Sequence, residues 1–317
     1  MRVWIMVSLL VALVVAGCAD GGSDPGLLPE EGAADPGEVP LLGPGTELAE
    51  GFTVPDGAEL MTWPTAGWHT TGVDAAWGAS MWVTGDPIEV FNSLADQAVE
   101  QGYDVVQQGD GNCRILQDTP PKPWIDCHTL GYRVDPGPRS ERVHLSVSDR
   151  GNGLPLARVD VGTVETAVLK DFGVDPWQLP RFEPETAQAE ASDVDLVPSD
   201  VGVGDRLVDA DWHRTTLVGD SRLVAAKAGP GDDCTTGMAA VVHVDGDPDE
   251  VFDAYASQLL DVDDVVGSPT EDEALPDVLG RRTRYVHGRS DDYWTMTMVV
   301  GSGDEPTRIL IEEQCAD

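Results

Sequence analysis

The sequence contains the same motif twice, and this repetition constrains the fold more than any other feature of the chain. Residues 85–91 read GDPIEVF and residues 246–252 read GDPDEVF, an offset of 161 residues. Residues 68–71 (WHTT) resemble residues 212–216 (WHRTT) at an offset of 144, and Val54-Pro55 resembles Val197-Pro198. Motifs repeated in the same order predict a duplicated unit. The offset rises from 144 at the Trp-His segments to 161 at the GDP motifs, so we expect 17 extra residues between these two motifs in the second copy, Cys234 among them.

The repeated GDP motif predicts the start of an amphipathic helix in each copy. Asp86 and Asp247 can cap a helix, and the proline after each suits the first helical position. A glutamate three residues after each aspartate fits a capping box. Apolar residues at 90, 91, 94 and 98, and at 251, 252, 255 and 259, then share one helical face.

Alternating or apolar segments on both sides of each helix predict strands. They lie at 80–84, 103–108, 113–117, 125–134, 143–148, 157–161, 239–244, 282–286, 293–300 and 308–313. The expected fold class is α+β, with two tandem repeated domains, 51–165 and 197–317, joined by a linker at 166–196. Each domain is expected to be an antiparallel sheet with one amphipathic helix packed on a face.

The N-terminal residues have the pattern of an export signal. Arg2 precedes an apolar run at 3–15 that only Ser8 interrupts, and Val15-Ala16-Gly17-Cys18 follow. The run has about 13 residues, fewer than the ~20 that a membrane-spanning helix needs. The pattern resembles the signal peptide and lipobox of bacterial lipoprotein precursors. Beyond residue 18 the sequence resembles no characterised family.

The resemblance implies a signal peptide at 1–17 and acylation of Cys18, with palmitate among the attached chains. The lipid bilayer would then be a partner through the Cys18 anchor, on the extracytoplasmic face of the cell membrane. Residues 18–50 are rich in Gly, Pro, Glu, Asp and Ala, so we expect a flexible acidic tether.

Four cysteines remain besides Cys18. An exported protein meets an oxidising compartment, which favours disulfides, and four cysteines allow three pairings. We expect Cys113–Cys127 and Cys234–Cys315, because each pair then lies inside one proposed domain.

The chain is strongly acidic, with 57 Asp and Glu, 19 Lys and Arg, and a formal net charge of −38. Such a charge repels phosphate backbones, so we expect no nucleic-acid partner. It favours cationic or neutral partners instead.

Motifs that would carry catalysis or hold a metal do not stand out. The chain has no Gly-x-Ser-x-Gly, Ser-x-x-Lys or His-Glu-x-x-His, so we assign no catalytic residue and leave enzymatic activity open. Asp245-x-Asp247-x-Asp249 lacks the glycine of a calcium loop, so we expect neither a metal nor a cofactor. His69 and His213, each after a tryptophan, are interpreted as structural.

The tryptophans are the candidate ligand-binding residues. Nine are present, against five phenylalanines and five tyrosines. Exposed rings at Trp63, Trp68 or Trp77 could stack on sugars or anchor a partner, whereas we expect Trp82 in the core.

The sequence predicts a noncatalytic binding or scaffolding role at the cell envelope, toward a protein or a wall component. Two alternatives stay open. One is a module that binds wall glycan through tryptophan faces, and the other is an envelope hydrolase with a site between the domains.

Overall fold

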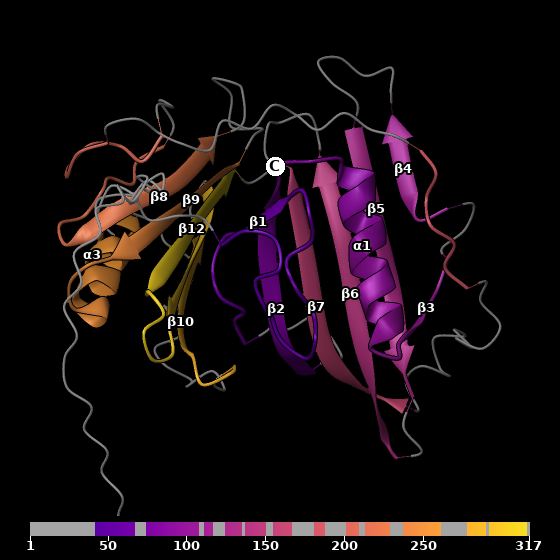
Figure 1. Ribbon diagram of the computed structural model, residues 1–317. Coiled ribbons are helices and arrows are strands. Elements are labelled where there is room, and N and C mark those ends of the chain that lie inside the picture. The colour runs from indigo at the N-terminus through magenta and orange to yellow at the C-terminus, as the bar shows by residue number, and fades with distance from the viewer. Residues whose placement is uncertain are drawn as a thin grey trace, which may run out of the picture. The chain divides into compact units, whose positions relative to one another are not determined.

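The computed structural model describes residues 42–66, 74–107, 111–116, 124–134, 137–149, 155–166, 181–187, 201–208, 213–228, 237–260, 278–289 and 292–315. These residues form two antiparallel sheets and two helices, α1 and α3 (Figure 1). The α+β fold class with antiparallel sheets that was predicted from the sequence is therefore confirmed.

The first sheet has seven strands, in the order β1-β2-β7-β6-β5-β3, with β4 also paired to β5. They are β1 (Ala58–Leu60), β2 (Asp74–Val83), β3 (Asp104–Val105), β4 (Cys113–Leu116), β5 (Trp124–Arg133), β6 (Arg139–Asp149) and β7 (Leu156–Glu165). In β6, Val143, Leu145 and Val147 alternate with polar residues and belong to the core that α1 covers. Successive side chains of a strand point to opposite faces, so the polar residues of β6 face away from α1.

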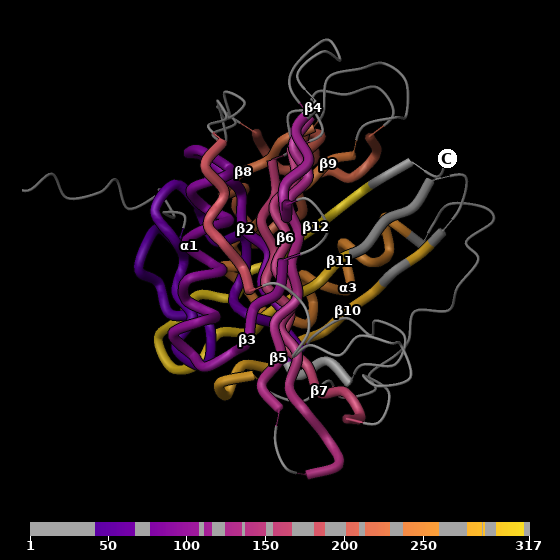
Figure 2. The backbone as a smooth tube through the Cα atoms, turned by 90° about the vertical axis from the view of Figure 1, so that its right-hand side faces the viewer, coloured from indigo at the N-terminus to yellow at the C-terminus, as the bar shows by residue number. Residues whose placement is uncertain are grey.

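Helix α1 (Pro87–Glu100) packs on one face of this sheet and contacts β5, β6 and β7 (Figure 2). Asp86 caps the helix as the GDP motif predicts, because its carboxylate accepts hydrogen bonds from the backbone N–H of Ile88 and Glu89. Val90, Phe91, Leu94 and Ala98 are all fully buried. The helical spacing of apolar residues thus identified the buried face.

The second sheet has five strands, in the order β10-β11-β12-β9-β8. They are β8 (Ser221–Ala228), β9 (Met238–Val244), β10 (Arg282–Arg289), β11 (Asp292–Val300) and β12 (Arg308–Cys315). Helix α3 (Pro248–Leu260) is capped by Asp247, whose carboxylate accepts hydrogen bonds from the backbone N–H of Asp249 and Glu250. Phe252 and Tyr255 of α3 are buried in a core with residues of β9, β11 and β12.

The faces that the helices leave uncovered contact each other. Met61 and Trp82 from the first sheet region pack with Ala225, Ala239, Val241 and Leu310 of the second sheet. Trp82 is fully buried there, as predicted. In β12, Ile309 and Ile311 belong to the core under α3, and Leu310 between them packs toward the first sheet.

Two described segments lie outside the domain limits that the sequence suggested. Leu48 and Ala49 are buried in the core of the first sheet, and Leu42 forms a bridge with Leu60. The last residues of the expected tether are therefore folded, because Leu48 is apolar and packs beside the sheet. Residues 181–187 of the expected linker also contact the first sheet, since the backbone N–H of Phe182 donates to the carbonyl of Val105 at 3.0 Å.

Candidate functional site

The predicted anchor lies outside the described residues, as do the signal peptide and the tether up to residue 41. Among the residues that the structure describes, no helix is long and apolar enough to cross a membrane. Acylation of Cys18 therefore stays a prediction.

The structure contains the disulfide predicted between Cys113 and Cys127. The two cysteines face each other across the antiparallel pair β4 and β5. Cys234 lies outside the described residues, and only the backbone of Cys315 is described, within β12. The second predicted disulfide therefore stays a prediction.

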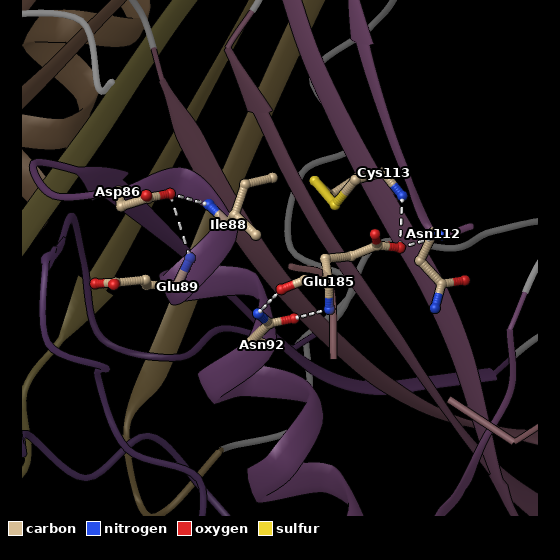
Figure 3. The surroundings of a disulfide bond; sticks show 8 residues. Asp86, Ile88, Glu89, Asn92, Asn112, Cys113 and Glu185 are labelled. Atoms are coloured by element: carbon tan, nitrogen blue, oxygen red, sulfur yellow. Dashed lines mark hydrogen bonds between the residues drawn. A yellow bond between two sulfur atoms is a disulfide. The ribbon is translucent and has the colours of Figure 1, made fainter. Parts of the chain in front are cut away.

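A glutamate of the expected linker holds the strand that carries the disulfide (Figure 3). The Glu185 carboxylate accepts from the backbone N–H of Asn112 at 2.6 Å and of Cys113 at 3.3 Å. The backbone of Glu185 also exchanges two hydrogen bonds of 2.9 Å with the side chain of Asn92 in α1. Glu185 thus connects the start of β4 to α1, which is a structural role that the sequence did not indicate.

Trp63 and Trp77, two of the candidate ligand-binding tryptophans, are buried. Trp63 is 7% exposed and Trp77 is 3% exposed, and both belong to the core of the first sheet. Trp77 packs edge to face with Phe52, while the Arg281 guanidinium lies over the ring of Trp63, 4.4 Å from its centroid. Neither ring is available for stacking on a ligand, and Trp68 lies outside the described residues.

His213 is fully buried, consistent with a structural interpretation. Its Nδ1 contacts the carboxylate of Glu313, which also accepts a hydrogen bond from the Thr215 hydroxyl. A buried carboxylate needs such partners, because an unpaired buried charge is costly. His69 lies outside the described residues.

A polar cavity of about 280 Å³ lies between the helix-free faces of the two sheets. The first sheet contributes Gly78, Ala79, Ser80, Arg142, His144, Ser146, Arg158 and Asp160, the second contributes Thr297, Leu310 and Glu312, and Thr62 and Thr65 complete the lining. Arg142, His144 and Ser146 point into the cavity because they alternate along β6 with the buried valines and leucine under α1.

Two side-chain pairs line this cavity. Arg158 Nη2 lies 3.2 Å from Glu312 Oε1, and this pair joins β7 to β12. His144 Nδ1 lies 3.8 Å from Asp160 Oδ2, which is longer than a hydrogen bond. A Cβ at position 78 would lie 2.6 Å from Asp160 Oδ1, so the glycine of β2 leaves room for this carboxylate.

A buried arginine lies on the same face of β12 as Leu310, which lines the cavity. Arg308 is 1% exposed and precedes Leu310 by two residues, so both side chains point toward the first sheet. Burial lowers the pKa of Arg308 to about 10, because a low-dielectric environment disfavours the charged form. Arg308 therefore still carries a positive charge at neutral pH.

The residues that line the cavity are not among the predicted site residues. The alternation of Arg142, His144 and Ser146 with apolar residues is visible in β6, but such alternation is typical of any strand with one solvated face. Nothing in the sequence pairs β7 with β12, so the ion pair of Arg158 with Glu312 could not be foreseen.

The cavity presents donors and acceptors without a recognised catalytic group. Arginine guanidiniums and hydroxyls can donate, whereas the carboxylates of Asp160 and Glu312 can accept. In the part of the chain that the structure describes, no group of three or more His, Cys, Asp or Glu side chains could hold a metal ion. The arrangement suits recognition of a small polar molecule.

Comparisons with known proteins identify no relative. No protein-family model matches the chain, and no curated protein matches its sequence. A solved structure described as a bifunctional dehydratase-cyclase domain in ambruticin biosynthesis aligns with 80% of this chain and 95% of its own, at 14% identity. Its TM-score is 0.15, which is too low to carry an argument about fold or activity.

Proposed function

We propose that this protein is a lipid-anchored, extracytoplasmic lipoprotein whose folded part binds a small polar ligand without transforming it. The observation that carries the binding role is the polar cavity between the helix-free faces of the two sheets. The anchor rests on the lipobox pattern at Val15-Ala16-Gly17-Cys18. The acidic segment that follows would act as a tether between the membrane and the folded part.

The proposal includes a tandem duplication, which the strand order supports. Strands β1-β2-β7-β6-β5 have the same order and chain sequence as β8-β9-β12-β11-β10, and a helix follows the second strand in each set. Each helix lies against its own sheet and is capped by the aspartate of its GDP motif. Two unrelated sheets would not be expected to share both the order and the cap.

Repeated hydrogen bonds also support the duplication. Gln97 of α1 accepts from the backbone N–H of Thr53 at 2.8 Å, and Gln258 of α3 accepts from that of Thr216 at 2.9 Å. The two glutamines occupy the same position relative to their capping aspartates. The same long-range contact in both halves is best explained by common descent.

These contacts give a different alignment from the one based on the WHTT and WHRTT segments. They align Thr53 with Thr216, an offset of 163 residues, which is close to the 161 of the GDP motifs. The 17-residue insertion is then unnecessary. Residues 43–48 (GPGTEL) also match residues 202–207 (GVGDRL), at an offset of 159 residues. In these segments the backbone N–H groups of Thr46 and Asp205 donate to the carbonyls of Gly43 and Gly202.

The residues of the cavity bear on the two alternative functions, a wall-glycan module and an envelope hydrolase. A wall glycan stays a candidate ligand, although the buried Trp63 and Trp77 cannot supply stacking faces. For the hydrolase alternative, the cavity offers His144 and Asp160, which lie 3.8 Å apart, longer than a hydrogen bond. We therefore propose binding rather than catalysis.

The anchor is tested by fractionating cells that express the full chain. Cys18→Ala is expected to release the protein from membranes or to leave an unprocessed precursor. Cys234→Ala, which changes a cysteine outside the lipobox, should behave like the wild type. A processed Cys18→Ala protein that still fractionates with membranes would contradict the anchor.

The binding role is tested with the full chain in detergent and a panel of soluble wall-glycan fragments. We expect at least one fragment to raise the melting temperature in a saturable manner. Ser146→Tyr, which fills the cavity from β6, should abolish this shift. Ser148→Tyr lies on the same face of the strand outside the lining and should preserve it. Equal shifts in both variants, or turnover of a bound fragment, would contradict the proposal.

A further inference from the structure

We infer that the cavity between the sheets selects an uncharged ring with several hydroxyl groups, the chemistry of a neutral monosaccharide. This inference rests on the proposed binding function and specifies its ligand class. Three features of the cavity lead to it: two buried threonine hydroxyls without hydrogen-bond partners among the described residues, the balance of charges in the lining, and the size.

Thr297 of β11 brings a buried hydroxyl to the cavity. Its side chain is 7% exposed and belongs to the cavity lining. Met296 and Met298 on either side belong to the core under α3, so Thr297 points from the opposite face of the strand toward the first sheet. No described residue forms a hydrogen bond with its hydroxyl. A buried hydroxyl without a partner is unfavourable, so a hydrogen bond from a molecule in the cavity would stabilise this group.

Thr65 brings a second such hydroxyl from the first sheet region. Its side chain is 9% exposed and also belongs to the lining. The backbone of Thr65 exchanges two hydrogen bonds with Gly78 of β2, at 2.9 and 2.8 Å, which fix its position. Within the part of the chain that the structure describes, the Thr65 hydroxyl has no hydrogen-bond partner, whereas the neighbouring Thr62 hydroxyl donates to the carbonyl of Trp63 at 3.2 Å. Each sheet region thus supplies one fixed hydroxyl that is open to a ligand.

Hydroxyl groups of a ligand match these threonines. A hydroxyl can donate and accept at once, so two hydroxyls can pair in either sense. A carboxylate can only accept and an ammonium can only donate. Ser80 and Ser146 add two more hydroxyls to the lining, so several hydroxyls of one ring can be bound together.

The charges of the lining balance each other. Arg142 and Arg158 stand against Asp160 and Glu312, and Arg158 pairs with Glu312 at 3.2 Å. With His144 neutral, the formal charges of the lining therefore sum to zero. A charged ligand would lose its hydration without gaining an excess of opposite charge, and burying a charge without a partner is costly. An uncharged ligand avoids this cost.

The size of the cavity limits the ligand to a small molecule. Its volume of about 280 Å³ is slightly below the ~300–1,000 Å³ typical of ligand pockets. Leu310 adds an apolar side chain to the lining, against which the C–H groups of a sugar ring can pack. A single ring fits this space better than an extended chain.

The inference is tested by measuring binding of two matched series of sugars to the full chain in detergent. One series is glucose, glucuronic acid and 6-amino-6-deoxyglucose, and the other is the corresponding set built on galactose. Within each series the three sugars differ only at carbon 6, which carries a hydroxyl, a carboxylate or an ammonium. We expect saturable binding of at least one hexose, and at least about tenfold weaker binding of both of its charged analogues.

Threonine variants identify the hydroxyls that bind. Thr297→Val and Thr65→Val keep the shape of the side chain and remove the hydroxyl, so each should weaken hexose binding about three- to tenfold. Thr283→Val is the matched control, because Thr283 of β10 is 5% exposed, its hydroxyl also lacks a partner among the described residues, and it lies outside the lining. Its hexose affinity should equal that of the wild type. Without ligand, unfolding curves of all three variants should match the wild type, since no hydrogen bond within the protein is lost.

The results separate this inference from the proposed function. A charged analogue that binds as tightly as its hexose, or unchanged hexose affinity in both Thr297→Val and Thr65→Val, would overturn the selection of an uncharged ring. Failure of all six sugars, with glycan fragments still binding in a manner that Ser146→Tyr blocks, would also overturn it and leave the binding role intact. Sugar or glycan binding that Ser146→Tyr does not affect would overturn the proposed site itself.

Discussion

The indole N–H of Trp63 donates a 3.1 Å hydrogen bond to the carbonyl oxygen of Pro306, a residue 243 positions later in the chain. Trp63 follows β1 of the first sheet, and Pro306 precedes β12 of the second. Arg281 lies over the same indole ring and forms two hydrogen bonds of 2.7 Å with Glu305. One tryptophan therefore connects the two sheets through both its ring and its N–H group.

Changing Trp63 is expected to destabilise the fold. Trp63→Phe removes the hydrogen bond to Pro306 but keeps an aromatic ring, so it should cost about 1 kcal/mol. Trp63→Ala also removes the buried ring and should cost roughly 3–5 kcal/mol. Urea denaturation measures both losses, with Trp124→Phe in the partly exposed β5 as the control. Wild-type stability in Trp63→Ala would contradict the buried position of this residue.

Glu305 should make stability depend on pH in the acidic range. The hydrogen bond from Arg281 lowers the pKa of Glu305 from 4.5 to about 2. Its stabilising contribution is therefore present above pH 4.5 and is lost as the pH falls toward about 2. Because the carboxylate is partly solvated, we expect Glu305→Gln to cost roughly 1–2 kcal/mol at neutral pH.

Chemical denaturation of wild type and Glu305→Gln at several pH values checks this expectation. The difference between the two proteins should shrink as Glu305 becomes protonated. A difference that stays constant down to pH 2, or that grows on acidification, would show that the carboxylate is not stabilised by Arg281.

The two capping aspartates, Asp86 and Asp247, should make similar contributions to the free energy of unfolding. Asp86→Ala and Asp247→Ala each remove an acceptor for two backbone N–H groups at a helix start. Each substitution should cost about 1 kcal/mol, and serine at either position should retain most of the stability. Asp96→Ala, at an exposed position in the middle of α1, should change stability by less than about 0.5 kcal/mol. Thermal or urea unfolding measures all of these variants.

Loss of the first disulfide should destabilise the protein. Cys113 and Cys127 are separated by 14 positions, and closing a loop of about 15 residues is worth roughly 3 kcal/mol in the chain-entropy model. The double variant Cys113→Ala/Cys127→Ala should therefore lose about that much free energy of unfolding under oxidising conditions. Equal stability of the double variant and the wild type would contradict a stabilising disulfide.

The sequence was most informative where structure depends on neighbouring residues. The GDP motifs predicted both helix starts, because a cap needs only an aspartate and the backbone N–H groups that follow it. The spacing of Val90, Phe91, Leu94 and Ala98 predicted the buried face of α1 for the same local reason. The pairing of Cys113 with Cys127 was predicted because both lie inside one proposed domain.

The sequence was less informative where a residue's environment comes from distant segments. Trp63 and Trp77 were candidate ligand-binding residues, but both are buried. Pro306 and Arg281 contact Trp63, and Phe52 packs against Trp77. The alignment of WHTT with WHRTT relied on identical letters, whereas the hydrogen bonds from Thr53 and Thr216 depend on the position of each helix glutamine.

The sequence by itself determined two helix caps, the amphipathic segments, the acidic character and one disulfide, because these follow from neighbouring residues or composition. Only the tertiary structure decided that the helix-free faces of the two sheets meet and that Arg158 pairs with Glu312 across them. The cavity next to this pair exists because side chains from β6 and β7 face side chains from β11 and β12. Strand alternation fixes which residues share a face, but it does not specify which other face they will meet.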